Sequence, residues 1–266
     1  MTRTFLALLH FDGRGFIGWQ RQAAGRSVQG EVEQALSRLA AAPVAAVAAG
    51  RTDAGVHAEG LGVSFEMPVR WDGPALRRGL NALLPADCWA AELHEMVPGF
   101  HARKSALTRS YRYVVGTDDA SASPFRRPFE WSLQRPLDAA RLDAAAAVIR
   151  GEHQFEAFSI RGQEKPHHRC RLDRAEWRQR NGHGAVFHVE ADRFLHHMVR
   201  MLVGTMVEIA LHRRPLDDMR RLLASRDNQS TSAPAPPEGL YFVRATYPAS
   251  LYRTPAEELH ETLREE

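Results

Sequence analysis

The sequence predicts an α+β protein made of two halves, on three observations. The chain has 266 residues and is 44% hydrophobic, which is enough to bury the core of one large domain or of two ordinary ones. Short apolar runs typical of strands alternate with segments whose apolar residues recur at helical spacing. The order of these elements is similar in both halves of the chain. We therefore expect two related α+β units whose sheets join, with a cleft between them.

The first half, residues 1–103, is expected to run strand, helix, strand, strand, helix, strand. Ser27 is suited to cap the first helix, whose apolar stripe extends from Val28 to Leu39, and Pro43 closes it. The other expected elements are a strand at Thr4–Phe11, a short strand before Gly50, a strand at Leu61–Phe65, a helix at Pro74–Leu84 and a strand at Cys88–Met96.

The second half is expected to span residues 104–252, and residues 253–266 form an acidic tail. Pro255–Glu266 is polar and is expected to be a frayed terminal helix. The expected strands are Ser110–Val115, Arg174–Gln179, Val186–Ala191 and Leu240–Thr246, and the expected helices are Leu137–Ile149, Phe194–His212 and Leu216–Ala224.

Several protein classes are disfavoured by the sequence. No apolar run approaches the roughly 18 residues of a membrane span. The apolar run at the N-terminus is followed by Asp12 and Gly13, so we expect a strand there and not a signal peptide. Cys88 and Cys170 match no metal or disulfide spacing, so we expect reduced thiols and a cytoplasmic protein.

Two patterns that could indicate a cofactor are weak. Gly13 to Gly18 reads GRGFIG, which fits the dinucleotide-binding pattern, but the next helix is not expected before Ser27 and no acid ends the following strand. A P-loop motif is absent from the sequence. The adjacent pairs His167-His168 and His196-His197 do not share a helix face as metal ligands would. Neither a nucleotide cofactor nor a metal is expected.

Positive charge is concentrated in one segment of a chain whose formal net charge is +3. Residues 96–117 contain no acid, and within them Pro98–Val115 combines four cations with three aromatic residues. Cations suit backbone phosphates and aromatic rings suit unstacked bases, so the segment favours looped or single-stranded RNA. A solvated loop that leads into a strand, with Tyr111 and Tyr113 in the core, explains the same residues equally well.

The segment AAGRTDAGVHA, Ala48–Ala58, places opposite charges inside a glycine-bounded loop. A tight turn explains the glycines but not the arginine and aspartate. Arg200 lies in the strongly apolar segment Arg193–Leu211, and a buried cation is costly unless an anion meets it. Asp53 is a candidate for that anion. An aspartate paired in this way stays ionised, as a nucleophile must.

Five segments, taken in chain order, resemble the TruA family of tRNA pseudouridine synthases. The resemblance spans nearly the whole chain. The five segments are FDGRGFIGWQRQ (Phe11–Gln22), GRTDAGVHA (Gly50–Ala58), FHARKSALTRSYRY (Phe100–Tyr113), FLHHMVRMLVG (Phe194–Gly204) and APAPPEGLYFVRATYP (Ala233–Pro248).

The resemblance implies an enzyme that isomerises uridine to pseudouridine at positions 38, 39 and 40 in the anticodon stem-loop of tRNA. It implies two ferredoxin-like (RNP-like) halves that form one continuous, mainly antiparallel sheet, with helices packed on one side and a central cleft. It also implies a homodimer that holds tRNA by its anticodon arm and needs no metal, ATP or organic cofactor.

The same resemblance implies roles for single residues. The nucleophile falls on Asp53, and the arginine that helps to flip the target nucleotide falls on Arg51. The basic partner of the aspartate falls on Arg200, and the tyrosine that stacks on the uracil falls on Tyr111. Leu240 corresponds to an apolar residue that lines the uracil pocket. The residues expected to contact tRNA are Phe100, His101, Arg103 and Lys104, with Lys165 of the Arg161–Lys165 loop as a further candidate.

Two segments depart from the family pattern. The family reads G-Q-V where this chain has Gly60-Leu61-Gly62-Val63, which removes a local polar contact. The segment PHHRCRLDR around Cys170 matches its counterpart poorly, so RNA contacts there are not assigned. These departures affect fine specificity and leave the reaction class unchanged.

Two other functions fit the same residues. A non-catalytic tRNA-binding protein on this fold predicts that Asp53 can be replaced without loss of any activity. An aspartate-dependent N-glycosidase predicts free uracil and an abasic site, but it would normally use a second carboxylate as acid, and the glycine-bounded loop contains none besides Asp53.

Overall fold

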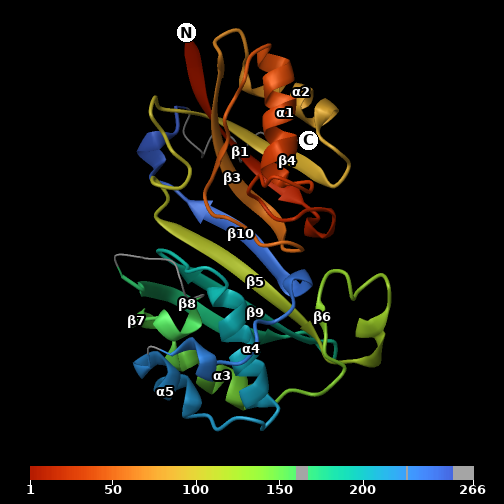
Figure 1. The fold of residues 1–266 in the computed structure, drawn as a ribbon, viewed down its shortest axis with the longest axis vertical. Helices are drawn as coiled ribbons and strands as arrows, with labels where there is room; N and C mark the ends of the chain where they lie inside the picture. Colours follow the sequence, from red (N-terminus) through yellow and green to blue (C-terminus); the bar gives the residue numbers. More distant parts are fainter. Residues whose placement is uncertain (160–166, 226, 254–266) are drawn as a thin grey trace. The chain divides into compact units, whose positions relative to one another are not determined.

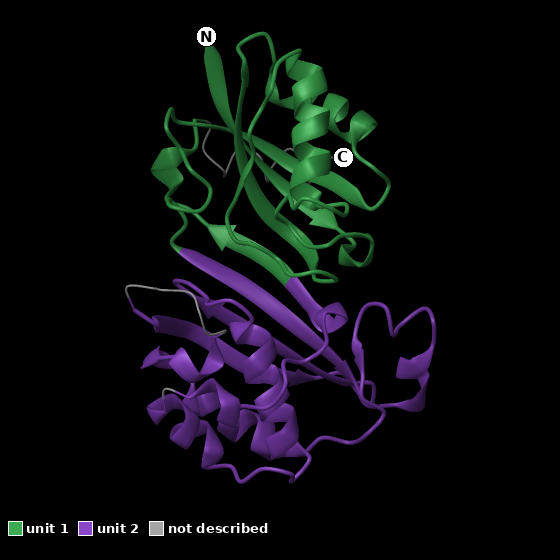
Figure 2. Cartoon of the chain, viewed as in Figure 1, with its two compact units in different colours: residues 1–107, 242–266 green, residues 108–241 purple. Residues whose placement is uncertain are grey.

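The computed structural model describes residues 1–159, 167–225 and 227–253, as a ribbon in Figure 1. The chain divides into two compact units (Figure 2). Unit 1 contains Met1–Leu107 and Phe242–Glu266, and unit 2 contains Thr108–Tyr241. The C-terminal part of the chain therefore returns to the unit formed by its N-terminal part.

Unit 1 contains antiparallel strands with β1 (Thr2–Phe11) between β4 (Cys88–Met96) and β3 (His57–Pro68). The short strand β2 (Val47–Ala48) pairs with β3, and β10 (Leu240–Thr246) follows β3 in the strand order. The register places Phe5 opposite Phe65, and their rings stack with centroids 6.3 Å apart. These alternating apolar side chains build the core of the unit.

Two helices cover one face of these strands, α1 (Val28–Ala40) and α2 (Gly73–Leu83) (Figure 1). The hydroxyl of Ser27 accepts from the amide of Gly30 at 3.2 Å, and the carboxylate of Asp72 accepts from the amide of Ala75 at 2.7 Å. Such caps satisfy amides that the first turn of a helix leaves unpaired. Among the fully buried side chains between helices and strands are Phe5, Leu9, Leu36, Leu61, Met67, Leu76 and Leu80.

Unit 2 contains a second antiparallel arrangement in the order β5-β9-β8-β7. The four strands are β5 (Thr108–Gly116), β9 (Gly184–Ala191), β8 (Arg169–Gln179) and β7 (Gly151–Gln154), and the short β6 (Trp131–Ser132) runs parallel to β5. Tyr113, Phe187 and Trp177 lie side by side in this register. Their rings supply much of the apolar area of the unit.

Three helices pack on one face of the unit 2 strands, α3 (Ala139–Val148), α4 (Met198–Ala210) and α5 (Asp218–Ala224) (Figure 1). Helix α4 is buried along most of its length, which accords with its apolar sequence. It begins at Met198 and not at Phe194, because His197 has a φ of +62° and interrupts the helical backbone. The 3-10 helices are Gly13–Gly15, Asp119–Ala122, Glu156–Phe158, Asn228–Ser230, Pro237–Gly239 and Ala249–Leu251.

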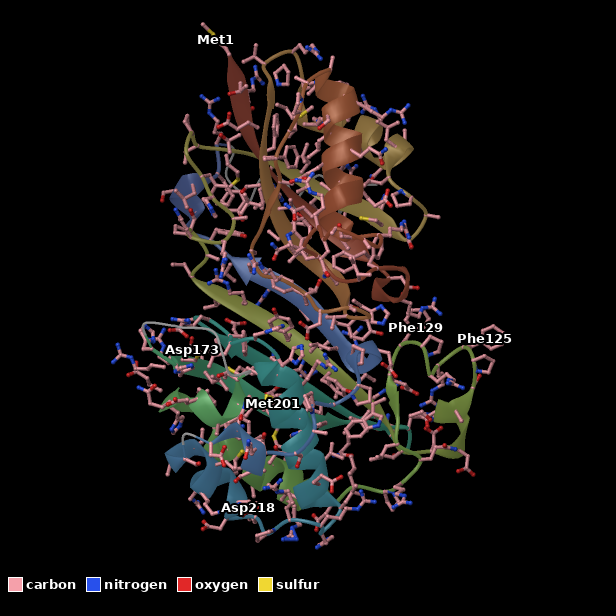
Figure 3. All side chains as sticks on the ribbon, in the orientation of Figure 1. Met1, Phe125, Phe129, Asp173, Met201 and Asp218 are labelled. Carbon is pink, nitrogen blue, oxygen red and sulfur yellow. The ribbon has the colours of Figure 1, made fainter. Side chains whose placement is uncertain are left out.

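A long loop between β5 and β6, residues 117–130, is held by ion pairs; we call it the excursion. The guanidinium of Arg126 binds Asp118 at 2.7 Å and Glu130 at 2.8 Å, and Arg180 binds Glu130 at 2.5 Å. Two phenylalanines of the excursion, Phe125 and Phe129, are 88% and 38% exposed (Figure 3). The ion pairs thus fix a loop that presents apolar rings to its surroundings.

The predicted α+β class, with a large and mainly antiparallel sheet, is confirmed. The expected tail helix lies outside the described residues. No helix in the described ranges is both long and apolar enough to cross a bilayer.

Both cysteines are buried, and burial raises the pKa of the Cys88 thiol to about 12.

Candidate active site

The loop that connects β2 to β3 carries the predicted nucleophile; we call residues 50–57 the aspartate loop. Asp53 is half-buried, and Arg51 beside it is exposed. The carbonyl of Asp53 accepts from the amide of Val56 at 3.2 Å, and Gly55 in this turn has a φ of +78°. The glycine therefore allows a tight turn that directly follows the aspartate.

A second segment of unit 1 lies against the aspartate loop; we call residues 12–19 the glycine segment. Gly18 and Asp53 form an antiparallel bridge. The amide of Trp19 donates to the carbonyl of Thr52 at 3.0 Å. Thr52 and Trp19 are 7% and 4% exposed, so this contact is shielded from water. The backbone of Asp53 is thus fixed by a segment more than 30 residues earlier in the chain.

Two of the predicted tRNA contacts project from a tight turn in unit 1; we call residues 101–105 the basic turn. Nδ1 of His101 accepts from the amides of Arg103 and Lys104 at 3.2 and 3.3 Å. The carbonyl of His101 accepts from the amide of Ser105 at 2.9 Å. The Arg103 and Lys104 side chains are exposed. The imidazole of His101 therefore organises a turn that presents two cations.

The basic turn is anchored at Ala102. Its amide donates to Oγ of Ser64 at 3.0 Å, and its carbonyl accepts from the hydroxyl of Tyr247 at 3.0 Å. The ring of Phe100 packs edge-on against Tyr247, with centroids 5.0 Å apart, and is 7% exposed. Phe100 thus supports the turn from the core, while the cations lie at the surface.

In unit 2, the predicted stacking residue Tyr111 lies on β5 opposite Val189. Its side chain is half-buried. The ring meets Phe194 edge-on, with centroids 5.0 Å apart. An aromatic neighbour of this kind restricts the ring to a defined orientation. The contact with Phe194 therefore restricts the rotation of the Tyr111 ring.

Arg200 of α4 is tied to the segment that precedes Leu240; we call residues 233–239 the proline segment. Nε of Arg200 donates to the carbonyl of Ala235 at 2.7 Å, and the amide of Ala235 donates to the carbonyl of Arg200 at 2.9 Å. The hydroxyl of Tyr113 donates to the carbonyl of Pro236 at 2.7 Å, and burial raises the pKa of Tyr113 well above its usual value. These bonds fix the backbone just before Leu240, which is 5% exposed.

The predicted site residues fall in both units. Asp53 and Arg51 share unit 1 with the basic turn, whereas Tyr111, Arg200 and Leu240 belong to unit 2. The pairing of Asp53 with Arg200 would join the two units and stays a prediction. Lys165 and the rest of the Arg161–Lys165 loop lie outside the described residues.

Four residues that organise the site were not singled out from the sequence. They are Trp19, His57, Ser64 and Tyr247. Three of them, all except Ser64, lie within the segments that carry the family resemblance. Trp19 acts through its backbone amide, and the other three hold neighbouring backbone through their side chains. Composition and periodicity contain no signal for such contacts.

Comparisons with known proteins agree on one family. The model of a family described as tRNA pseudouridine synthase matches residues 145–248. A curated relative named tRNA pseudouridine synthase A, from Moorella thermoacetica, is 41% identical over 90% of this chain and 97% of its own length. Relatives with the same name from Shewanella sp. strain MR-7 and Pseudomonas aeruginosa are 41% and 38% identical over 90% of this chain, and over 91% and 84% of their own lengths.

Proposed function

This chain belongs to the tRNA pseudouridine synthase family of isomerases, and we propose that it modifies uridines 38, 39 and 40 in the anticodon stem-loop of tRNA with Asp53 as nucleophile. The observation that carries this proposal is the restrained position of Asp53. Its backbone is bridged to Gly18, Asp53 is half-buried, and Arg51, two residues earlier in the same loop, is exposed.

The proposed reaction begins when the target uridine leaves the base stack, at a cost of a few kcal/mol. Arg51 occupies the space that the base vacates, and the ring of Tyr111 stacks on the uracil. Such stacking is worth roughly 1–3 kcal/mol, which offsets part of the cost. The edge-on contact of Tyr111 with Phe194 supports this role because it orients the ring before the base arrives.

The carboxylate of Asp53 then attacks the nucleotide, at C1′ of the ribose or at C6 of the uracil. The bond from C1′ to N1 breaks, the uracil rotates, and a new bond joins C1′ to C5. The bond between Asp53 and the nucleotide then breaks, which restores the free carboxylate. The hydrogen of C5 leaves as a proton, and N1 gains a proton. The isomerisation is therefore balanced without an oxidant, a reductant or a second substrate.

Recognition of the anticodon arm is proposed to involve cations and a homodimer. The basic turn supports the first point, since Arg103 and Lys104 are exposed on a backbone fixed by His101 and cations bind phosphates. The homodimer is proposed by family resemblance. Light scattering coupled to size exclusion tests it directly, with a mass of one chain as the contradicting result.

The decisive experiment is release of tritium from tRNA labelled at C5 of uridine, in the presence of EDTA. The native protein should release tritium without forming free uracil, and Asp53→Asn should not. Asp143→Asn is the matched control, because Asp143 is an exposed carboxylate on α3. Transcripts that lack uridines at positions 38, 39 and 40 should release no tritium. Tritium release by Asp53→Asn would contradict the proposed nucleophile, and free uracil would indicate a glycosidase.

A further inference from the structure

A buried histidine, His57, joins the C-terminal end of the aspartate loop to the glycine segment. Trp19 contacts the same loop nearer its N-terminal end, at Thr52. The amide of Gly13 donates to Nδ1 of His57 at 3.2 Å, and His57 is 2% exposed. We propose that His57 is a positioning residue for Asp53, a neutral hydrogen-bond acceptor that fixes the C-terminal end of the aspartate loop. This inference rests on the catalytic role proposed above for Asp53.

The partner of Nδ1 determines the protonation of the ring. A backbone amide can only donate, so Nδ1 accepts and the proton of the neutral imidazole lies on Nε2. Asp12 approaches the same nitrogen, with Oδ1 at 3.4 Å. That oxygen already accepts from the amide and from Nε of Arg14, at 3.1 and 3.0 Å. The carboxylate therefore does not require a proton from His57.

The hydrogen bond to His57 holds two backbones in direct contact. A Cβ built on Gly13 would stand 2.1 Å from the carbonyl oxygen of Val56, far inside any real contact. Only glycine fits at this position, because the aspartate loop lies on the bare backbone of the glycine segment. Without the acceptor on His57, the buried amide of Gly13 would lose its partner, and the contact would become unfavourable.

The aspartate loop is thus fixed at both ends by one segment. At the first end, Trp19 binds the carbonyl of Thr52, and at the second end, Gly13 binds His57. Asp53 lies between these two points. A displacement of about 1 Å at a reacting group can reduce a rate about a hundredfold. Release of the second end should therefore change turnover much more than tRNA binding.

Two substitutions separate an acceptor from a simple space-filling side chain. His57→Asn retains an acceptor, since the amide oxygen of asparagine stands close to the position of Nδ1. His57→Leu has a similar size but no acceptor. Single-turnover rates and tRNA dissociation constants are measured for both. We expect His57→Leu to turn over about tenfold to a hundredfold more slowly with an unchanged dissociation constant, and His57→Asn to retain the native rate.

Cys88→Ala controls for a general loss of stability. Cys88 lies opposite Phe11, next to the glycine segment, and is 4% exposed. Its side chain can be shortened without removing either bond that holds the aspartate loop. This variant should be less stable and turn over at the native rate. The inference is overturned if His57→Leu is as fast as the native protein, if tRNA binding falls as much as turnover, or if His57→Asn is as slow as His57→Leu.

Hydrogen exchange tests whether His57 holds the aspartate loop, and this measurement does not depend on catalysis. In the tRNA-free protein, amides of residues 52–57 should exchange faster in His57→Leu than in His57→Asn, while amides of β4 remain equally protected. Equal exchange in the aspartate loop would overturn the inference. If the native protein formed no pseudouridine, the proposed function would fail, and the exchange result would still decide whether His57 holds the loop.

Discussion

The carbonyl oxygen of Thr52 lies so close to Gly18 that a Cβ built on Gly18 would stand 2.6 Å from it. Gly18 also has a φ of +108°, in a region where side chains cause backbone strain. These two restrictions are independent of each other. Both affect Asp53, because Gly18 is its bridge partner. The position of the proposed nucleophile therefore requires a residue without a side chain at position 18.

Gly18→Ala should reduce both stability and turnover. Gly99→Ala is the matched control, since Gly99 has a φ of +80° but a Cβ added there would have no described atom within 4 Å. The backbone strain alone should lower the free energy of unfolding by about 1–2 kcal/mol in Gly99→Ala, and the added overlap should raise the loss to about 2–5 kcal/mol in Gly18→Ala. Urea unfolding and tritium release measure the two effects. Equal turnover in both variants would contradict this account.

Removal of either cation of the basic turn should weaken tRNA binding in a salt-dependent way. Arg103→Ala and Lys104→Ala should each make the slope of log affinity against log salt shallower by about 0.7–0.9, the change for one lost phosphate contact. The measurement is filter binding of tRNA over a series of KCl concentrations. Arg220→Ala removes the same charge from an exposed residue of α5 and should leave the slope unchanged. A loss of affinity with an unchanged slope would argue against phosphate contacts.

His188 should make the protein less stable in mild acid. Burial and the nearby guanidinium groups of Arg174 and Arg178 hold the pKa of His188 below its usual value of 6.5, and Glu176 opposes them only in part. The unfolded chain therefore binds a proton at a higher pH than the folded protein does. Stability falls as the pH decreases below about 6.5 and levels off below the folded pKa.

His188→Gln should flatten this part of the pH dependence. The free energy of unfolding in urea is measured between about pH 5 and pH 8. His183→Gln is the control, because Nδ1 of His183 faces the carboxylate of Asp118 at 3.3 Å and not a guanidinium. It should not flatten the curve. The same acid sensitivity in His188→Gln and in the native protein would assign the effect to other groups.

Tyr113→Phe should loosen the proline segment. The variant leaves the carbonyl of Pro236 without its donor in a part-buried position, which costs about 0.5–1.5 kcal/mol. Tyr241→Phe removes a bond of the same length, 2.7 Å, to the carbonyl of Phe129. Both variants should unfold at lower urea, but only Tyr113→Phe should turn over more slowly, since it alone releases the backbone before Leu240. Equal turnover in the two variants would show that the proline segment does not influence catalysis.

Elements with sharp boundary residues were predictable from the sequence. The strands Cys88–Met96 and Leu240–Thr246 have the bounds that were expected, because prolines or glycines flank apolar runs there. Ser27 caps α1 as expected, with its hydroxyl on the amide of Gly30. In each case the local sequence and the tertiary packing favour the same boundary for the helix or strand.

Other elements depend on contacts that the sequence does not display. The expected helix from Phe194 begins at Met198, since His197 adopts a left-handed backbone conformation that its residue type does not demand. Strand β7 reads Gly-Glu-His-Gln and has no apolar alternation. It forms only because β8 offers an edge to pair with.

The role of the glycine segment in the site also could not be predicted from the sequence. Its glycine spacing resembles a dinucleotide motif, and the late helix and the missing acid argue against that function without indicating another purpose for the glycines. The structure supplies one, since Gly13 and Gly18 each lie against a carbonyl of the aspartate loop. Close contact between two backbones leaves no trace in hydrophobic periodicity.

The burial of both cysteines makes this chain convenient for site-specific labelling. Burial raises the pKa of Cys88 to about 12, so its thiol stays protonated at neutral pH, and Cys170 is fully buried. A maleimide dye should therefore leave the native protein unlabelled. A single cysteine introduced at an exposed position could then carry a fluorophore, with neither natural thiol removed.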